Sequence, residues 1–282
     1  MVSSALAVGW FQHLAQFWAE RSEKAGVPGA SPFDSEANVA VAAWLFHDMP
    51  DAGELQDYRP PTATRVYAWD GTLIGEYSKE RRIFVPYDQI PPQLAQAFMA
   101  AEDKRFYKHG PIDLYGIARA ALVNFKAKRT VQGASTLSQQ LAKGLFLTPD
   151  RTAKRKLQEM VMARALEKVL TKDEILELYL NRVFFGANTF GVDGAARTYF
   201  NKPASQLTLS EAALLAALPK APSRLALTRD MSGALARSRL VLANMRQEGW
   251  ITAEQESRAL DDTPRLSPLA VQNEVEYCWV LD

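Results

Sequence analysis

The chain has 282 residues, 48% of them hydrophobic and 23% charged, and a formal net charge of +1. These values are typical of a globular protein, and the overall charge favours no particular partner. The single cysteine, Cys278, excludes an internal disulfide, and the three histidines lie too far apart in sequence for a structural zinc site. Residues 119–156, however, contain nine Lys or Arg and one acid. This stretch is either a solvated basic face or the site of an anionic partner.

The N-terminal part of the chain is apolar in places. Residues 2–20 are apolar and aromatic, but Gln12 and His13 interrupt the run, and no basic n-region precedes it. Residues 39–46 are far shorter than the ~20 apolar residues of a spanning helix. Either run could lie in a membrane interface. We therefore interpret residues 1–58 as a membrane-proximal segment without a clear transmembrane helix.

A small β-hairpin is predicted next, within a segment of residues 59–90 that also includes a linker. Two β-prone runs in TRVYAWDGTLIGEYS are joined by Asp70-Gly71, a strong short-range hairpin signal. The sequence Ile90-Pro91-Pro92 then ends extended structure and opens a helix, because proline suits the first helical turn.

The remaining chain has the pattern of helices. Capping boxes precede three apolar runs, and a buried helix in EAALLAALPKAPS is predicted to end at Pro219 and Pro222. We expect a mainly α fold, with a main domain at residues 91–230 and, at 231–282, a closing helical pair and the start of a linker. The capping pairs are Thr171 with Glu174, Thr208 with Glu211 and Thr252 with Gln255, and one buried stripe is Leu176, Tyr179, Leu180 and Val183.

The segment AAEDKRFYKHG, residues 100–110, contains the first candidate catalytic group. Its pattern favours an amphipathic helix in which Glu102 and Asp103 stand side by side and Phe106 lies one turn from Glu102. A carboxyl group at the edge of an apolar surface acquires a raised pKa, which suits a general base. The alternative is an exposed acid on a helix surface.

A second polar segment is QGASTLSQQLAKGLFL, residues 132–147. Ser135 or Thr136 can cap the helix that follows. Gln139, Gln140 and Lys143 then fall within one turn and could bind sugar hydroxyls or phosphate. The apolar LFL that follows is either core or a surface that meets lipid.

The third segment, RTAKRKLQEM, spans residues 151–160. Arg151, Arg155 and Glu159 recur every four residues and share one helix face, where the arginines can bind an anion. A salt-bridge ladder is the simpler alternative. Taken together, the three segments indicate sugar transfer from a phosphorylated donor, with a carboxylate as base and cations at the leaving group. No D-x-D motif or phosphate-binding GxxxxGK loop is present.

Four motifs in register extend this interpretation. The sequences EDKRFYKHGPID, QGASTLSQQLAKGLFL, RTAKRKLQEM and KDEILELYLNRVFFGANTFGVDGAARTYF resemble, in the same order, the peptidoglycan glycosyltransferase domain of class A penicillin-binding proteins. The resemblance covers residues 64–227. It implies a lysozyme-like fold with a head and a membrane-facing jaw. It also implies polymerisation of lipid II into glycan strands, with release of undecaprenyl pyrophosphate, inversion at the donor anomeric carbon and inhibition by moenomycin.

The resemblance assigns roles by motif. Glu102 is the expected general base and Glu159 the second acid. Lys143 and Arg151 are expected to stabilise the departing pyrophosphate, reinforced by Arg155 and Lys156. No metal ligand and no required cofactor are implied, although a divalent cation such as Mg²⁺ is compatible. The residues expected to line the cleft are Asp103, Arg119, Ser135, Thr136, Gln139 and Gln140.

The implied partners are lipid II, the growing glycan chain, a membrane surface and other cell-wall synthesis proteins. Nucleic acid is not expected, because the basic stretch lacks interleaved aromatics. The implied location is the bacterial plasma membrane, with the catalytic domain on the extracytoplasmic side.

The order Gly110-Pro111 departs from the family pattern, so we expect the following loop to differ. No S-x-x-K or K-T-G transpeptidase motif occurs, which suggests a truncated bifunctional enzyme. An inactive membrane-associated scaffold and a lysozyme-like hydrolase are the alternatives.

Overall fold

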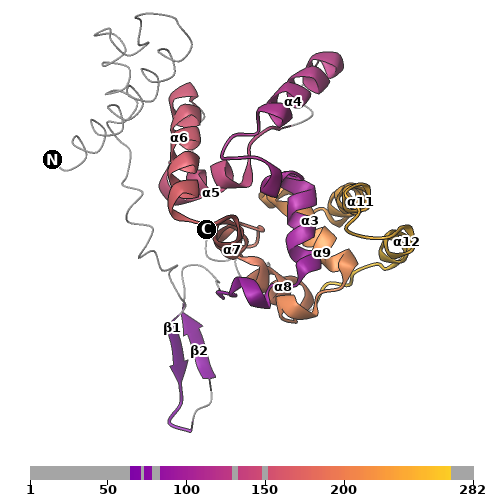
Figure 1. Cartoon of the computed structure of the whole chain (residues 1–282). Helices are drawn as coiled ribbons and strands as arrows, with labels where there is room; N and C mark the ends of the chain where they lie inside the picture. The colour runs from indigo at the N-terminus through magenta and orange to yellow at the C-terminus, as the bar shows by residue number, and fades with distance from the viewer. Residues whose placement is uncertain (1–63, 71–72, 78–82, 129–132, 148–151, 268–282) are drawn as a thin grey trace, which may run out of the picture.

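The computed structural model describes residues 64–70, 73–77, 83–128, 133–147 and 152–267 (Figure 1). The predicted membrane-proximal segment 1–58 lies outside these residues. Within them the chain is mainly helical, which confirms the predicted fold class. No helix in these ranges is both long and apolar enough to cross a bilayer. The predicted domain boundaries, and the division into head and jaw, stay predictions.

Two antiparallel strands occupy the predicted hairpin region. Strand β1, Thr64–Tyr67, pairs with β2, Leu73–Tyr77, and the register shifts between Val66 and Tyr67. Gly71, in the predicted turn, lies outside the described residues. The hairpin lies apart from the helices (Figure 1).

Three helices from distant parts of the chain pack together. Helix α3, Pro92–Glu102, begins at the predicted prolines and contacts both α9, Leu209–Ala217, and α11, Met231–Gln247. Every residue of α9 after Leu209 is buried. Helix α12, Ala253–Asp261, packs on α11 and completes the predicted closing pair.

A second group of helices lies beside this one. Helix α5, Leu137–Phe146, packs against α6, Ala153–Val169, and α7, Lys172–Arg182. Helix α8, Val192–Phe200, then leads through a 3-10 turn, Ala204–Gln206, to α9. After α9 come the 3-10 turn Leu218–Lys220, which contains Pro219, and the short helix α10, Pro222–Leu225.

Local helix signals were predicted well. All three capping boxes form, at Thr171 with Glu174, Thr208 with Glu211 and Thr252 with Gln255. In the predicted stripe, Leu176, Tyr179 and Leu180 are buried, and Val183 caps the end of α7. The segment before α3 is tied to α7 as well: Val85 N–H donates to Asn181 Oδ1 at 2.7 Å, and Asn181 Nδ2 donates to the Val85 carbonyl at 2.8 Å.

Helix α4, Leu114–Ala127, projects away from the packed helices (Figure 1). It carries large apolar side chains that remain in solvent: Phe125 is 83% exposed and Leu114 75%, and Tyr115 and Leu122 are more than half exposed. Few of its residues are buried, so α4 presents an apolar surface rather than a core-facing stripe.

The predicted amphipathic helix over residues 100–110 is wrong. Helix α3 ends at Glu102, Asp103 has φ −154°, and only a 3-10 turn follows at Phe106–Lys108. The cause is tertiary: the Asp103 carboxylate accepts a hydrogen bond from Leu137 N–H at the start of α5, 3.1 Å away. Phe106 is nevertheless buried, as the apolar pattern required.

Candidate active site

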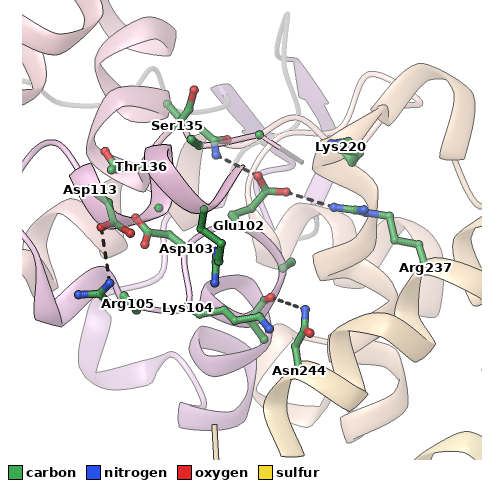
Figure 2. Close-up of a pocket in the computed structure, with 17 residues that line it drawn as sticks. Glu102, Asp103, Lys104, Arg105, Asp113, Ser135, Thr136, Lys220, Arg237 and Asn244 are labelled. Atoms are coloured by element: carbon green, nitrogen blue, oxygen red, sulfur yellow. Dashed lines mark hydrogen bonds and ion pairs between the residues drawn. The ribbon is translucent and has the colours of Figure 1, made fainter. Parts of the chain in front are cut away.

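A cavity of about 320 Å³ lies where the end of α3 meets α11 and the segment before α5 (Figure 2). Glu102 and Asp103 line it from the end of α3, together with Lys104 and Arg105. Arg119 of α4 also lines it. The other walls come from residues 133–136, Gln140, Lys220, Arg237 and Asn244. Asp113 lines it as well, so the cavity holds three carboxylates, those of Glu102, Asp103 and Asp113, among several cations.

Glu102 is held in one orientation by contacts from two helices. Its Oε2 accepts a hydrogen bond from Gln140 Nε2 at 2.9 Å, and the Tyr179 hydroxyl donates in turn to Gln140 Oε1 at 3.5 Å. Its Oε1 is buried and accepts no hydrogen bond from the residues that the structure describes. Arg237 Nη2 lies 3.8 Å from Oε1 (Figure 2). One carboxylate oxygen is thus fixed by a hydrogen bond, and the other is buried without one.

The pKa of Glu102 is raised above its usual range. Burial disfavours the charged form and is the largest cause; the Gln140 hydrogen bond and the charges of Arg237 and Lys220 act in the opposite direction. The neighbouring Asp103 adds a small upward contribution. A carboxylate whose pKa is raised towards neutrality is a stronger base than an ordinary Glu, which suits proton abstraction.

Asp103 lines the cavity but is largely occupied by structural contacts. Its Oδ1 lies 2.7 Å from His109 Nε2, and its Oδ2 accepts from Leu137 N–H. Burial acts to lower the pKa of His109, but the hydrogen bonds to Asp103 and to the Gly110 carbonyl outweigh it and raise the pKa. Asp103 therefore joins the end of α3 to the start of α5 and fixes Glu102 relative to Gln140.

The polar residues of α5 divide between two directions. Thr136 caps the helix by accepting from Gln139 N–H, and its hydroxyl donates to the Pro111 carbonyl at 2.8 Å. Gln139 also donates to Pro111, whereas Gln140 turns to Glu102. Lys143 is exposed and does not line the cavity. The three predicted neighbours thus do not form one patch, and the Gly110-Pro111 loop is held through the Pro111 carbonyl.

Glu159 is 3% exposed and paired closely with two cations of α6. Arg155 Nη1 lies 2.9 Å from its Oε1, and Lys156 Nζ lies 2.7 Å from its Oε2. Lys156 also donates to the Ser135 hydroxyl at 2.7 Å, and Ser135 lines the cavity. Glu159 itself is not a lining residue. Arg151 lies outside the described residues.

Sequence reasoning missed the contribution of the C-terminal helices to the cavity. Arg237 and Asn244 reach it from α11, and Lys220 reaches it from the turn after α9. Asn244 Nδ2 donates to the Ala100 carbonyl at 3.0 Å. A usable signal existed, because Arg237 and Asn244 are seven residues apart, on one helix face, beside the buried Val241.

Comparison with known proteins defines the class of protein. Residues 70–246 match the transglycosylase family model, and the chain belongs to this family. It is similar to penicillin-binding protein 1A of Escherichia coli (strain K12), with 48% identity over 212 residues, which cover 75% of this chain and 25% of that protein. It is also similar to penicillin-binding protein 1A of Rickettsia felis, with 46% identity over 223 residues, 77% of this chain and 28% of the relative.

The chain spans between a quarter and a third of the length of these relatives. Among solved structures it is similar to penicillin-binding protein 1A from Haemophilus influenzae, with a TM-score of 0.43 and 28% identity over 74% of this chain and 22% of that one. In the described part of the chain, no group of three or more His, Cys, Asp or Glu side chains is arranged to hold a metal ion.

Proposed function

We propose that this chain is a peptidoglycan glycosyltransferase, which polymerises lipid II into glycan strands with release of undecaprenyl pyrophosphate. The observation that carries the proposal is the setting of Glu102. Its carboxylate is buried and oriented, has a raised pKa, and stands in a cavity also lined by Arg119, Lys220 and Arg237. A base for an incoming hydroxyl beside cations for an anionic donor is what this transfer requires.

In the proposed reaction, the 4-hydroxyl of the acceptor GlcNAc gives its proton to Glu102 Oε1. The hydroxyl oxygen forms a bond to the anomeric carbon of the donor chain as the bond from that carbon to the pyrophosphate oxygen breaks. Undecaprenyl pyrophosphate leaves with the bonding electron pair, and the anomeric configuration inverts because the acceptor oxygen attacks the face opposite this leaving group. Gln140 occupies Oε2, which leaves Oε1 as the oxygen that the acceptor hydroxyl approaches.

On the donor side, we propose that Lys143 and Arg151 stabilise the departing pyrophosphate and that Arg155 and Lys156 add to the positive field. The contact from Lys156 to Ser135 supports this assignment, because it joins the α6 cations to the cavity wall. In this assignment Glu159 holds the two cations in place and takes no proton itself.

The proposed substrate carries a lipid tail, so the domain must work at a membrane surface. The exposed apolar side chains of α4 support this requirement, because they would be covered at a bilayer interface. We propose that the catalytic domain lies on the extracytoplasmic face of the bacterial plasma membrane, with other cell-wall synthesis proteins as partners. Liposome co-sedimentation of the chain with Phe125→Ser in α4 tests the surface: we expect weaker binding, and unchanged binding would contradict it.

The direct test is incubation of the purified chain with labelled lipid II in detergent, with and without moenomycin. We expect glycan strands that moenomycin abolishes and that Glu102→Gln does not make. Glu254→Gln is the matched control, because Glu254 is exposed on α12 and does not line the cavity. This variant should polymerise like the wild type.

The same assay separates the alternatives. A well-folded wild-type chain that makes no polymer would favour the inactive scaffold. Shortening of added glycan strands would favour a hydrolase, in which two carboxylates must flank the scissile bond. The close pairing of Glu159 with Arg155 and Lys156 argues against a second reacting carboxylate at that position.

A further inference from the structure

Arg237 holds an unusual position between two helices. Its Nε donates a hydrogen bond to the carbonyl of Ala217 at 3.0 Å, and Ala217 is the fully buried last residue of α9. The other edge of the guanidinium faces Glu102, with Nη2 3.8 Å from Oε1 (Figure 2). The side chain thus leaves α11, is fixed at α9 and ends opposite the last residue of α3.

At its distance from Glu102, Arg237 acts on the carboxylate through its charge and not through a hydrogen bond. N–H···O hydrogen bonds span about 2.7–3.2 Å, so 3.8 Å is too long for one. Arginine remains charged at any pH relevant to a protein, so its field acts on Glu102 continuously. A closer guanidinium would occupy the lone pair of Oε1 that must accept a proton. The hydrogen bond from Arg237 Nε to the Ala217 carbonyl holds the guanidinium in place and so opposes its movement towards Oε1.

The other groups around Glu102 cannot replace this charge in the same way. Gln140 of α5 donates a neutral hydrogen bond to Oε2, and Tyr179 of α7 reaches Glu102 only through Gln140. Asp103 is a like charge beside Glu102, and its interaction disfavours ionisation. Lys220 is a cation, and its influence on Glu102 is smaller than that of Arg237. Against strong desolvation by burial, Arg237 is therefore the main opposing charge.

We propose that Arg237 is a positioning residue for the glycosyl transfer: a counter-ion, fixed by the Ala217 carbonyl, that keeps Glu102 ionised while leaving Oε1 without a hydrogen bond, so that this oxygen can accept the proton of the acceptor hydroxyl. The proposal rests on the proposed function, because it assumes that Glu102 is the base. It assigns a part of the site to α11, beyond the four motifs of the sequence.

The first test is the pH dependence of lipid II polymerisation by the full chain in detergent. A base must be ionised, so kcat/KM falls as the pH drops through the Glu102 pKa. An opposite charge within about 4–6 Å lowers a carboxyl pKa by about 1–3. Arg237→Met should therefore move the acidic limb of the profile upward by about 1–3 pH units, with activity recovering at higher pH. Arg237→Lys retains the charge and should keep the limb close to that of the wild type.

A second readout does not depend on activity. In the full chain labelled with carboxyl-¹³C glutamate, the Glu102 resonance is the one missing from Glu102→Gln. Its titration midpoint should rise in Arg237→Met and in Arg237→Gln, which retains a donor for the Ala217 carbonyl. Arg239→Met is the matched control, because Arg239 is exposed on the same helix and does not line the cavity. Its midpoint should equal that of the wild type.

The outcomes separate this inference from the proposed function. An unchanged Glu102 midpoint in both Arg237→Met and Arg237→Gln would overturn the inference, whatever the activity. An equal loss of activity at every pH would also overturn it, because that result describes a cation that binds substrate. If the wild-type chain made no polymer, the proposed function would fail; if Glu102→Gln still polymerised lipid II, the assignment of Glu102 as the base would fail. In both cases a raised midpoint would still establish the pairing of Arg237 with Glu102.

Discussion

Glu102, which lines the cavity, and Glu159, which does not, differ in how their charge is balanced. Glu159 has two cations at 2.9 and 2.7 Å, whereas Arg237, which pairs with Glu102, stands at 3.8 Å. Close ion pairs balance the charge of Glu159, so the residue serves to hold Arg155 and Lys156. Looser pairing leaves Oε1 of Glu102 able to take a proton. Glu102 and Glu159 therefore suit different roles because the cations around them lie at different distances.

The largest expected effect on stability comes from removing the charge of Glu159. Glu159→Gln leaves Arg155, which is mostly buried, without its counter-charge. Breaking a buried ion pair on one side costs about 3–5 kcal/mol, and we expect about 3 because Lys156 reaches solvent. Denaturant unfolding of Glu159→Gln, Glu102→Gln and the control Glu254→Gln measures this difference. Equal stability of all three variants would contradict the conclusion that the Glu159 charge holds Arg155 and Lys156 in place.

Asp103 should have a smaller but measurable structural effect. Asp103→Asn weakens the hydrogen bond from Leu137 N–H and the contact with His109. Hydrogen bonds to charged groups contribute about 1.5–3 kcal/mol each, so a loss of about 2 kcal/mol is expected. Asp261→Asn, on the exposed end of α12, is the control. If Asp103→Asn kept full stability but lost lipid II binding, Asp103 would be a substrate ligand rather than a structural joint.

The smallest expected effect is the pH dependence of stability that Glu102 causes. A carboxyl whose folded-state pKa is raised contributes stability below its unfolded pKa, near 4.5, and loses it as the pH rises through the folded value. A difference of one between the folded and unfolded pKa values corresponds to about 1.4 kcal/mol. The wild type should therefore lose stability relative to Glu102→Gln as the pH rises above 4.5. A constant difference across this range would mean that the Glu102 pKa is not raised.

The features that were best predicted from the sequence depend on neighbours in the chain. The capping boxes at Thr171, Thr208 and Thr252 each need only a partner three residues away, so they follow from local sequence. The end of α3 does not, because Asp103 is drawn to Leu137 by the packing of α5. No breaker residue marks that end in the sequence.

The residues of the candidate site also differ in whether local sequence predicts them. The motifs supplied Glu102 and the cations of α6, and Gln140 was predicted to line the cleft. No local pattern indicated directly that Arg237 would face Glu102, since the two residues belong to helices far apart in the chain and meet only through the packing of α3 on α11. Long-range contacts of this kind require the fold.

The central claim is that Glu102 takes the proton of the acceptor hydroxyl. Its most direct test measures lipid II binding and polymerisation together in Glu102→Gln, which retains the size of the side chain. A general base contributes about 10²–10⁴-fold to the rate, so we expect turnover to fall by that factor while the lipid II Kd stays close to the wild-type value. Weakened binding with turnover preserved at saturating lipid II would contradict the account.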